Sequence, residues 1–338
     1  MNTSTAHMTQ HEMVENESIV SHVLVYDVSA YALDKIKDFC DKNSLIGLRT
    51  QSDSMNDVLE SNVHLGAVFL CEDLDETGKS GIEIAVEIHQ RRPELPIFIR
   101  RTEVKDLHDL PKELQTIFAG AYHNDTFDTL KKLIDRYLFS LHYPEELVSG
   151  IKEMSLEVLH SSFKDMEVFC DTPYIVKDKI IYGELFSLMP IEASWCRGYM
   201  MLQTEERSMM DAIRAEKTQL SPIDPDFREV NTMLSEISNM AWGGFKSRFA
   251  SGEEENQEDL SHRIQVPIII NHSHKYISFG SDEPQLCYRY TLVDPDGRLA
   301  PVSLYQKFVF SLSWSPEKFK VNQQQVDDLV DNGALELF

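Results

Sequence analysis

The sequence predicts an α/β part followed by an α+β part, and three observations support this fold class. Short apolar runs alternate with helix-like stretches between residues 21 and 141, which is typical of a doubly wound parallel sheet with helices on both faces. Beyond Tyr143 and Pro144, long amphipathic helices are grouped beside consecutive strand-like stretches, which favours an antiparallel sheet. The length of 338 residues also suits two domains better than one.

In the first part, each apolar run has the length of a buried parallel strand. The predicted strands are Val23–Tyr26, Leu45–Leu48, Ala67–Leu70, Pro96–Ile99 and Phe118–Tyr122. Helical spacing is found at Ala30–Cys40, around Val58 and Leu59, at Gly81–Ile88 and at about Thr126–Leu141. Residues 1–20 are polar and acidic and are predicted to be a flexible leader, so the first domain is placed at residues 21–142.

The second part is predicted to combine long helices with antiparallel strands. The helices are Leu147–Phe163, Glu205–Glu216 and Pro225–Phe249, and the strands are Ile180–Met189, Trp195–Leu202, Ile264–Ile270, Tyr276–Phe279, Leu286–Val293 and Ser303–Ser313. Asp294–Gly297 has the composition of a hairpin turn, and the acidic run 253–259 that of a solvated loop. This domain is placed at residues 144–314, and a helical tail, with a helix at 322–330, at residues 315–338.

Composition excludes several classes of partner. The chain carries 32 basic and 56 acidic residues, a formal net charge of −24, which argues against binding to nucleic acid or to an anionic membrane surface. No apolar run has the length of a membrane span and the first residues lack the features of a signal peptide, so we expect a cytoplasmic protein. The five cysteines are scattered without a CxxC pair, which favours reduced, buried thiols over disulfides or a zinc site.

One helix carries a pair of side chains suited to a particular reaction. Glu236 and Asn239 are three residues apart, which on a helix means about 60° of rotation and ~4.5 Å of rise, so both can reach one target. Hydrolysis of an acyl phosphate depends mainly on positioning the attacking water, and an amide can both donate to and accept from one water. A carboxylate beside it can pair with a lysine of a partner protein. By itself, Glu-x-x-Asn also occurs by chance on solvated helix faces.

The first domain resembles the receiver domain of bacterial response regulators. The resemblance spans about residues 21–141 and depends on the strand–helix alternation, Gly81-Ile82-Glu83, Pro96–Ile99 and Gly120-Ala121. It implies a flavodoxin-like doubly wound sheet. Receivers hold Mg²⁺ with a pair of acids after the first strand, and accept a phosphoryl group on an aspartate after the third. A Ser or Thr follows their fourth strand and a Lys their fifth.

Most of those receiver positions differ in this chain. Asp27 stands alone after the first strand, and Cys71 or Glu72 lies near the acceptor position, where Asp73 would serve only if the strand were shifted. Arg101 takes the Ser/Thr position with Thr102 one residue late, and Asp125-Thr126 replaces the Lys-Pro pair. We therefore interpret this domain as a pseudo-receiver that functions in docking or dimerisation. In the alternative, it is phosphorylated and controls the second domain.

The second domain resembles the CheC/CheX/FliY phosphatases of bacterial chemotaxis. Residues 236–247, EISNMAWGGFKS, are similar to the signature helix of that family, and Ile264–Ile270, which contains Pro267, is similar to its proline-containing strand. The resemblance spans about residues 145–314 and is closer to CheX, because the first long helix has no second Glu-x-x-Asn. It implies dephosphorylation of a CheY-type receiver by a homodimer that is built through the sheet.

The resemblance also implies catalytic roles for Glu236 and Asn239. The phosphorylated partner would bring its own Mg²⁺, so no cofactor or metal site is expected in this chain. Glu236 would pair with a lysine of the partner and Asn239 would orient the water. The alternative is a non-catalytic signalling adaptor that binds phosphorylated receivers without hydrolysing them.

Three further features have simple interpretations. His272-Ser273-His274 suggests a metal site, but without a third ligand a polar turn is favoured. Cys196 has no identifiable histidine base, so a buried thiol is favoured over a nucleophile. Gly243 and Gly244 lie inside a predicted helix, where each glycine costs about 1 kcal/mol relative to alanine. Close packing within the chain and close approach of a partner explain them equally well.

Overall fold

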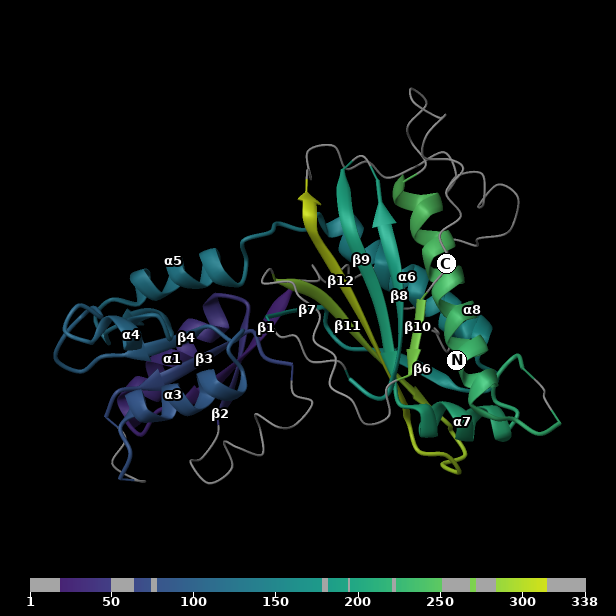
Figure 1. Cartoon of the computed structure of the whole chain (residues 1–338), viewed down its shortest axis with the longest axis horizontal. Coiled ribbons are helices and arrows are strands. Elements are labelled where there is room, and N and C mark those ends of the chain that lie inside the picture. Colours follow the sequence, from purple (N-terminus) through teal and green to yellow (C-terminus); the bar gives the residue numbers. More distant parts are fainter. Residues whose placement is uncertain are drawn as a thin grey trace, which may run out of the picture.

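The described residues form one twelve-stranded sheet. The computed structural model describes residues 19–49, 64–73, 78–177, 182–193, 195–220, 223–250, 268–271 and 284–314. Parallel strands form one end of the sheet and antiparallel strands form the other, each with its own set of helices (Figure 1).

The parallel end is built from strands and helices that alternate along the chain. The strands are β1 (Val20–Tyr26), β2 (Leu45–Arg49), β3 (Ala67–Cys71), β4 (Ile97–Arg100) and β5 (Phe118–Tyr122). The helices are α1 (Ala30–Lys42), α3 (Gly81–Arg91), α4 (Lys112–Gln115) and α5 (Phe127–Tyr137). Every pairing among β1 to β5 is parallel.

The antiparallel end combines longer strands with long helices. The strands are β6 (Glu167–Cys170), β7 (Tyr174–Val176), β8 (Leu185–Glu192), β9 (Cys196–Thr204), β10 (Ile268–Asn271), β11 (Gln285–Val293) and β12 (Val302–Trp314). The helices are α6 (Glu145–Ser162), α7 (Glu206–Arg214) and α8 (Phe227–Phe245), which continues as a π-helical turn at Lys246–Ala250. Pairings among these strands are antiparallel.

The strand order shows how the two ends meet. It runs β10-β8-β9-β12-β11-β7-β1-β3-β4-β5, with β2 also beside β1 and β6 also beside β11. The parallel and antiparallel strands were predicted, but their union in one sheet was not. The connection is a short parallel pairing in which Val20 and Ser21 of β1 lie beside Tyr174 and Ile175 of β7.

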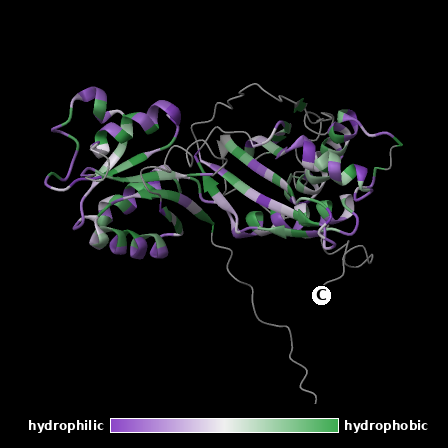
Figure 2. Ribbon diagram, turned by 90° about the horizontal axis from the view of Figure 1, so that it is seen from below, coloured by the Kyte–Doolittle hydropathy of each residue, from purple (hydrophilic) through white to green (hydrophobic). Residues whose placement is uncertain are grey.

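Two apolar layers enclose the parallel strands. Val23 and Val25 of β1 face the cluster that contains Ile36 of α1 and Ile134 of α5, whereas Leu24 and Tyr26 face the cluster around α3. This alternation is the period of two expected for a strand buried on both faces. In Figure 2, largely green strands at the parallel end lie between helices that are banded green and purple.

The antiparallel end has a separate, larger core. Helices α6, α7 and α8 contribute buried residues to one cluster with β8, β9, β11 and β12. Its aromatic members include Tyr288, Tyr290, Phe308 and Phe310, none of which is exposed. These rings therefore belong to the core.

Hydrogen bonds outside the β1–β7 strand pairing also hold the two ends of the sheet together. The hydroxyl of Ser21 donates a hydrogen bond to the carbonyl oxygen of Ile175 (2.8 Å), and both residues are buried. The backbone N–H of Lys177 donates to the carbonyl oxygen of Leu65 (3.2 Å). The ring of His64 is hydrogen-bonded to the hydroxyl of Tyr174 (2.8 Å) in the buried interior. These contacts join segments that lie far apart along the chain.

Several predicted boundaries shift in the structure. The first strand begins at Val20, inside the predicted leader, because that residue pairs with β7. Strands β6 and β7 and helix α4 were not predicted, and the helix predicted at Pro225–Phe249 ends in the π-helical turn. The helix around Val58, the strand 276–279, the acidic run 253–259 and the tail 315–338 lie outside the described residues. The domain limits at residues 142 and 144 stay a prediction.

Substitution of Gly66 tests the junction. A Cβ atom at Gly66 would lie 2.1 Å from the hydroxyl oxygen of Ser21, so Gly66→Ala forces that hydroxyl away from Ile175. We expect a loss of about 1–3 kcal/mol in the free energy of unfolding, measured by urea denaturation, because a buried carbonyl loses its partner. Gly47→Ala is the matched control, since a Cβ there would meet its neighbours at 3.7 Å. Equal stabilities of the two variants would contradict this prediction.

Candidate functional site

Helix α8 begins at a capping box. The side chain of Asp226 accepts a hydrogen bond from the backbone N–H of Arg228 (2.7 Å), and the side chain of Glu229 accepts one from the backbone N–H of Asp226 (2.8 Å). These contacts satisfy N–H groups that a helix start leaves without intrahelical partners. The sequence thus fixes where the helix starts.

The buried stripe of α8 sets the rotation of the helix. Its members are Val230, Met233, Leu234, Ile237, Ser238, Ala241 and Phe245. The buried hydroxyl of Ser238 donates to the carbonyl oxygen of Leu234 (2.7 Å) and lies 2.5 Å from the hydroxyl of Ser187 on β8. An apolar stripe with one satisfied polar pair allows only one face of the helix to meet the sheet.

The opposite face of α8 presents Glu236 and Asn239 to solvent. Both residues are exposed, together with Thr232, Met240 and Gly243 on the same face. The exposed fraction of Met240 is 41%. Across the part of the chain that the structure describes, the side chains of Glu236 and Asn239 have no hydrogen bond or ion pair. The acid and the amide are therefore available to a visiting molecule.

The two glycines of α8 have different surroundings. A Cβ atom at Gly244 would lie 2.6 Å from Cγ and Sδ of Met154 on α6, so this glycine allows α6 and α8 to pack closely. A Cβ atom at Gly243 would have no neighbour within 4 Å. Packing within the described chain therefore explains Gly244 and leaves Gly243 unexplained.

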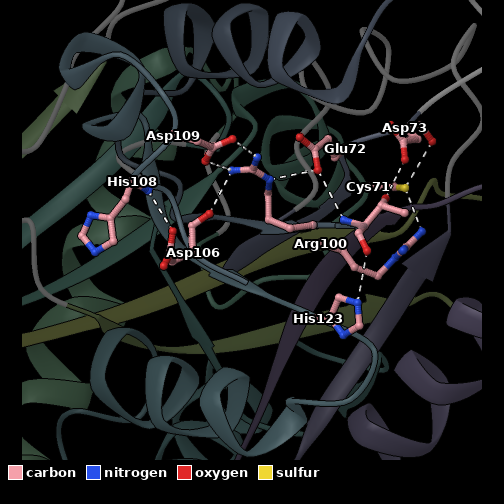
Figure 3. Close-up of polar contacts among 10 residues, drawn as sticks. Cys71, Glu72, Asp73, Arg100, Asp106, His108, Asp109 and His123 are labelled. Carbon is pink, nitrogen blue, oxygen red and sulfur yellow. Dashed lines mark hydrogen bonds and ion pairs between the residues drawn. The ribbon is translucent and has the colours of Figure 1, made fainter. Parts of the chain in front are cut away.

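A second group of polar residues lies at the carboxyl end of the parallel strands (Figure 3). The guanidinium of Arg100 donates two hydrogen bonds to the carboxylate of Asp27, at 2.6 and 2.9 Å. The guanidinium of Arg101 donates to Glu72 (2.9 Å) and to Asp109 (2.6 Å). The hydroxyl of Thr102 donates to the exposed carboxylate of Asp73 (2.6 Å). The sequence marked Asp27, Asp73 and Arg101 but did not mark Arg100.

The structure also brings Asp73 closer to the receiver pattern than the sequence indicates. Asp73 lies just after β3, and Thr102 lies just after β4. Parallel strands end at one edge of the sheet, so the two side chains meet there although each lies one or two residues beyond the expected position. His123 lies beside them, its ring 3.2 Å from the carbonyl oxygen of Thr102.

The other candidate residues from the sequence give no second site among the described residues. Cys196 is fully buried and its burial raises the pKa of the thiol, so it does not form a thiolate nucleophile at neutral pH. All five cysteines are free thiols. His272 and His274 lie outside the described residues. Within the described residues, no three His, Cys, Asp or Glu side chains are grouped as metal ligands, and no helix combines the length and apolarity needed to cross a membrane.

Solved structures provide the comparisons. No model of a protein family and no curated protein matches the chain. A CheC-like superfamily protein from Shewanella sp. PV-4 is 18% identical and has a TM-score of 0.33, with 49% of this chain and 99% of that chain covered. Chemotaxis protein CheX from Vibrio vulnificus is 18% identical and has a TM-score of 0.35, covering 48% and 99%. A response regulator receiver domain protein from Clostridium thermocellum is 18% identical and has a TM-score of 0.31, covering 35% and 94%.

The chain thus resembles CheC-like and CheX proteins over part of its length and receiver domains over part of its length. Similarities at this level concern the fold alone, so a function has to rest on the site itself.

The two glycines of α8 predict opposite effects of the same substitution. Gly243→Ala is expected to raise the free energy of unfolding by about 1 kcal/mol, because alanine favours the helix and the site is open. Gly244→Ala is expected to be less stable than Gly243→Ala by about 1–3 kcal/mol, because Met154 has to move. Urea denaturation followed by circular dichroism measures both. Two variants of equal stability would show that Gly244 has no packing role.

Proposed function

We propose that this protein is a phosphatase that removes the phosphoryl group from the aspartate of a phosphorylated CheY-type response regulator. The observation that supports the proposal is the exposed pair Glu236 and Asn239, which α8 holds on one face without partners among the described residues. In this proposal Asn239 orients the hydrolytic water and Glu236 docks the receiver.

The chemistry suits this pair of side chains. An acyl phosphate is hydrolysed through a loose transition state, so the protein contributes mainly position and electrostatic stabilisation. The amide of Asn239 can accept a hydrogen bond from the attacking water through its oxygen, or donate one to the water oxygen through its nitrogen. A water molecule held near the phosphorus atom attacks faster, because its position and orientation are already set. Because the amide carries no charge, it can approach the anionic phosphoryl group without repulsion.

The exposed face also carries residues other than solvating charges. Thr232, Met240 and Gly243 are exposed beside Glu236 and Asn239. An exposed methionine and an open glycine are not needed for solubility, whereas both help a partner to pack closely. A Cβ-free position at Gly243 lets a partner's backbone approach the helix near Asn239.

In this proposal the cation belongs to the partner. Glu236 makes no ion pair within the described residues, so its carboxylate can pair with a lysine of the receiver. The proposal needs no metal or cofactor in this chain, because a phosphorylated receiver would supply its own Mg²⁺. With a net charge of −24 the protein should meet its partner through this local contact and not through general attraction.

A homodimer through the sheet is part of the proposal. Among the strands that the structure describes, β10 is the last at the antiparallel end, beside β8. In this proposal a second copy adds its strands at that end.

Asn239→Ala should abolish most of the turnover and keep binding. We expect the rate of dephosphorylation of a phosphorylated receiver to fall about 100-fold, because the water loses its orienting group. Decay of the phosphorylated receiver measures the rate over a panel of stand-alone receivers, and fluorescence anisotropy measures binding. Gln90→Ala, which removes an exposed helical amide from α3, is the matched control and should behave as the wild-type protein.

One result would favour an adaptor over an enzyme, and another would contradict the role of Asn239. If the wild-type protein binds phosphorylated receivers without changing their decay, the chain is an adaptor and not a phosphatase. If Asn239→Ala dephosphorylates as fast as the wild-type protein, the assignment of the water-orienting role to Asn239 is wrong.

Glu236→Gln should act on binding more than on chemistry. Loss of one ion pair at a solvated rim is expected to weaken affinity by up to about fivefold at low salt. The salt dependence of binding should decrease, because screening then acts on one fewer charge pair. Titrations at low and high ionic strength measure both effects. An unchanged salt dependence would place the charge contact elsewhere on the surface.

A further inference from the structure

The carboxyl end of the parallel strands contains acids that have internal partners. Receiver domains, which this half resembles, use acids at this edge to hold Mg²⁺. The residues of this chain can be tested for the same role, because Asp27, Glu72 and Asp73 all lie at or just beyond the ends of β1 and β3. The contacts of each carboxylate decide whether an ion fits.

Asp27 has no free oxygen for a metal. One carboxylate oxygen accepts hydrogen bonds from the backbone N–H of Ser29 (2.9 Å) and from Arg100 (2.9 Å). The other accepts from Nε of Arg100 (2.6 Å). The exposed fractions of the side chains are 1% for Asp27 and 6% for Arg100. A two-pronged guanidinium–carboxylate pair of this kind is among the strongest polar contacts in proteins.

Arg100 also contacts the position where a third ligand would be expected. Its guanidinium lies 2.8 Å from Sγ of Cys71, the last residue of β3. Burial, together with the charge of Asp27, raises the pKa of Cys71 to about 11, so the sulfur is a neutral thiol at physiological pH. A neutral thiol is a poor ligand for Mg²⁺, which prefers oxygen.

The neighbouring acids also accept hydrogen bonds from side chains of the protein. Glu72 and Asp109 bind the guanidinium of Arg101, whose side chain is 3% exposed. Asp73 accepts the hydroxyl of Thr102 and is the exposed member of the group. Figure 3 shows Glu72 and Asp109 directed toward one guanidinium, that of Arg101. The last residue of β4, Arg100, and the residue after it, Arg101, thus supply two positive charges at one edge of the sheet.

Mg²⁺ does not fit this arrangement. The ion requires near-octahedral oxygen ligands and keeps several waters. To bind Asp27, it would have to displace a buried guanidinium that would then lack a counter-charge, which is costly in a protein interior. Two positive charges would also face each other across one carboxylate.

We infer that the receiver-like half is a metal-independent domain in which the guanidinium of Arg100 takes the electrostatic place of the divalent cation. The side chain joins the ends of β1, β3 and β4 through Asp27 and Cys71. Because this cation is covalently part of the chain, the edge of the sheet stays in one state whether or not Mg²⁺ is present. The half then acts as a constant docking module and does not accept a phosphoryl group in an Mg²⁺-dependent reaction.

The wild-type protein provides the first test. Isothermal titration with MgCl₂ is expected to show no saturable binding, and MgCl₂ is expected to leave the melting temperature at that of a matched NaCl control. Incubation with acetyl phosphate and MgCl₂, followed by intact mass measurement, should show no added phosphoryl group. A saturable Mg²⁺ site that Asp27→Asn removes, or the gain of one phosphoryl group on Asp73, would overturn the inference.

Variants of the ion pair provide the second test. Arg100→Met should lower the melting temperature, because it leaves the carboxylate of Asp27 buried without a positive charge beside it. The double variant Asp27→Asn with Arg100→Met should recover part of that loss, because no buried charge remains. Arg136→Met, at an exposed position of α5, is the matched control. Melting temperatures of Arg100→Met and Arg136→Met that are both equal to that of the wild-type protein would contradict the inference. If Arg100→Met does not fold, the wild-type titration decides.

Discussion

Strand β1 is the element on which the rest of the structure depends. It pairs with β2 on one side, with β3 on the other, and with β7 through its first residues. Its side chains enter both apolar layers of the parallel end. The hydroxyl of Ser21 reaches Ile175, and Asp27 just beyond the strand receives Arg100. One short segment therefore links the parallel sheet, the antiparallel sheet and the polar edge.

The hydrophobic pattern of the sequence predicted those strands and helices that depend only on neighbouring residues. Ala67–Leu70 and Pro96–Ile99 are wholly apolar, so their assignment as buried strands followed directly. The union of the two sheets could not be predicted in the same way. Strand β7 is only three residues long, Tyr174–Val176, and its partners lie far along the chain. Propensity and spacing do not specify which distant edge such a strand meets.

The two polar sites differ in how visible they were in the sequence. The orientation of Glu236 and Asn239 followed from helical periodicity, since the apolar positions of α8 define the opposite face. Arg100 was missed because a basic residue that follows an apolar run normally extends into solvent, whereas here the buried aspartate just beyond β1 accepts its hydrogen bonds. The roles of Gly243 and Gly244 needed coordinates as well, because only the position of Met154 separates them.

The shared sheet has a consequence for how the protein can be divided. Strand β7 is paired on one side with β11 and on the other with β1. Removing the first half by truncation would leave β7 with backbone N–H and C=O groups that face water, and would uncover Tyr174, which His64 covers. Bare strand edges of this kind recruit other chains and promote aggregation. If the chain is cut between α5 and α6, the half that carries α8 is therefore expected to aggregate. Its larger hydrophobic core does not prevent this.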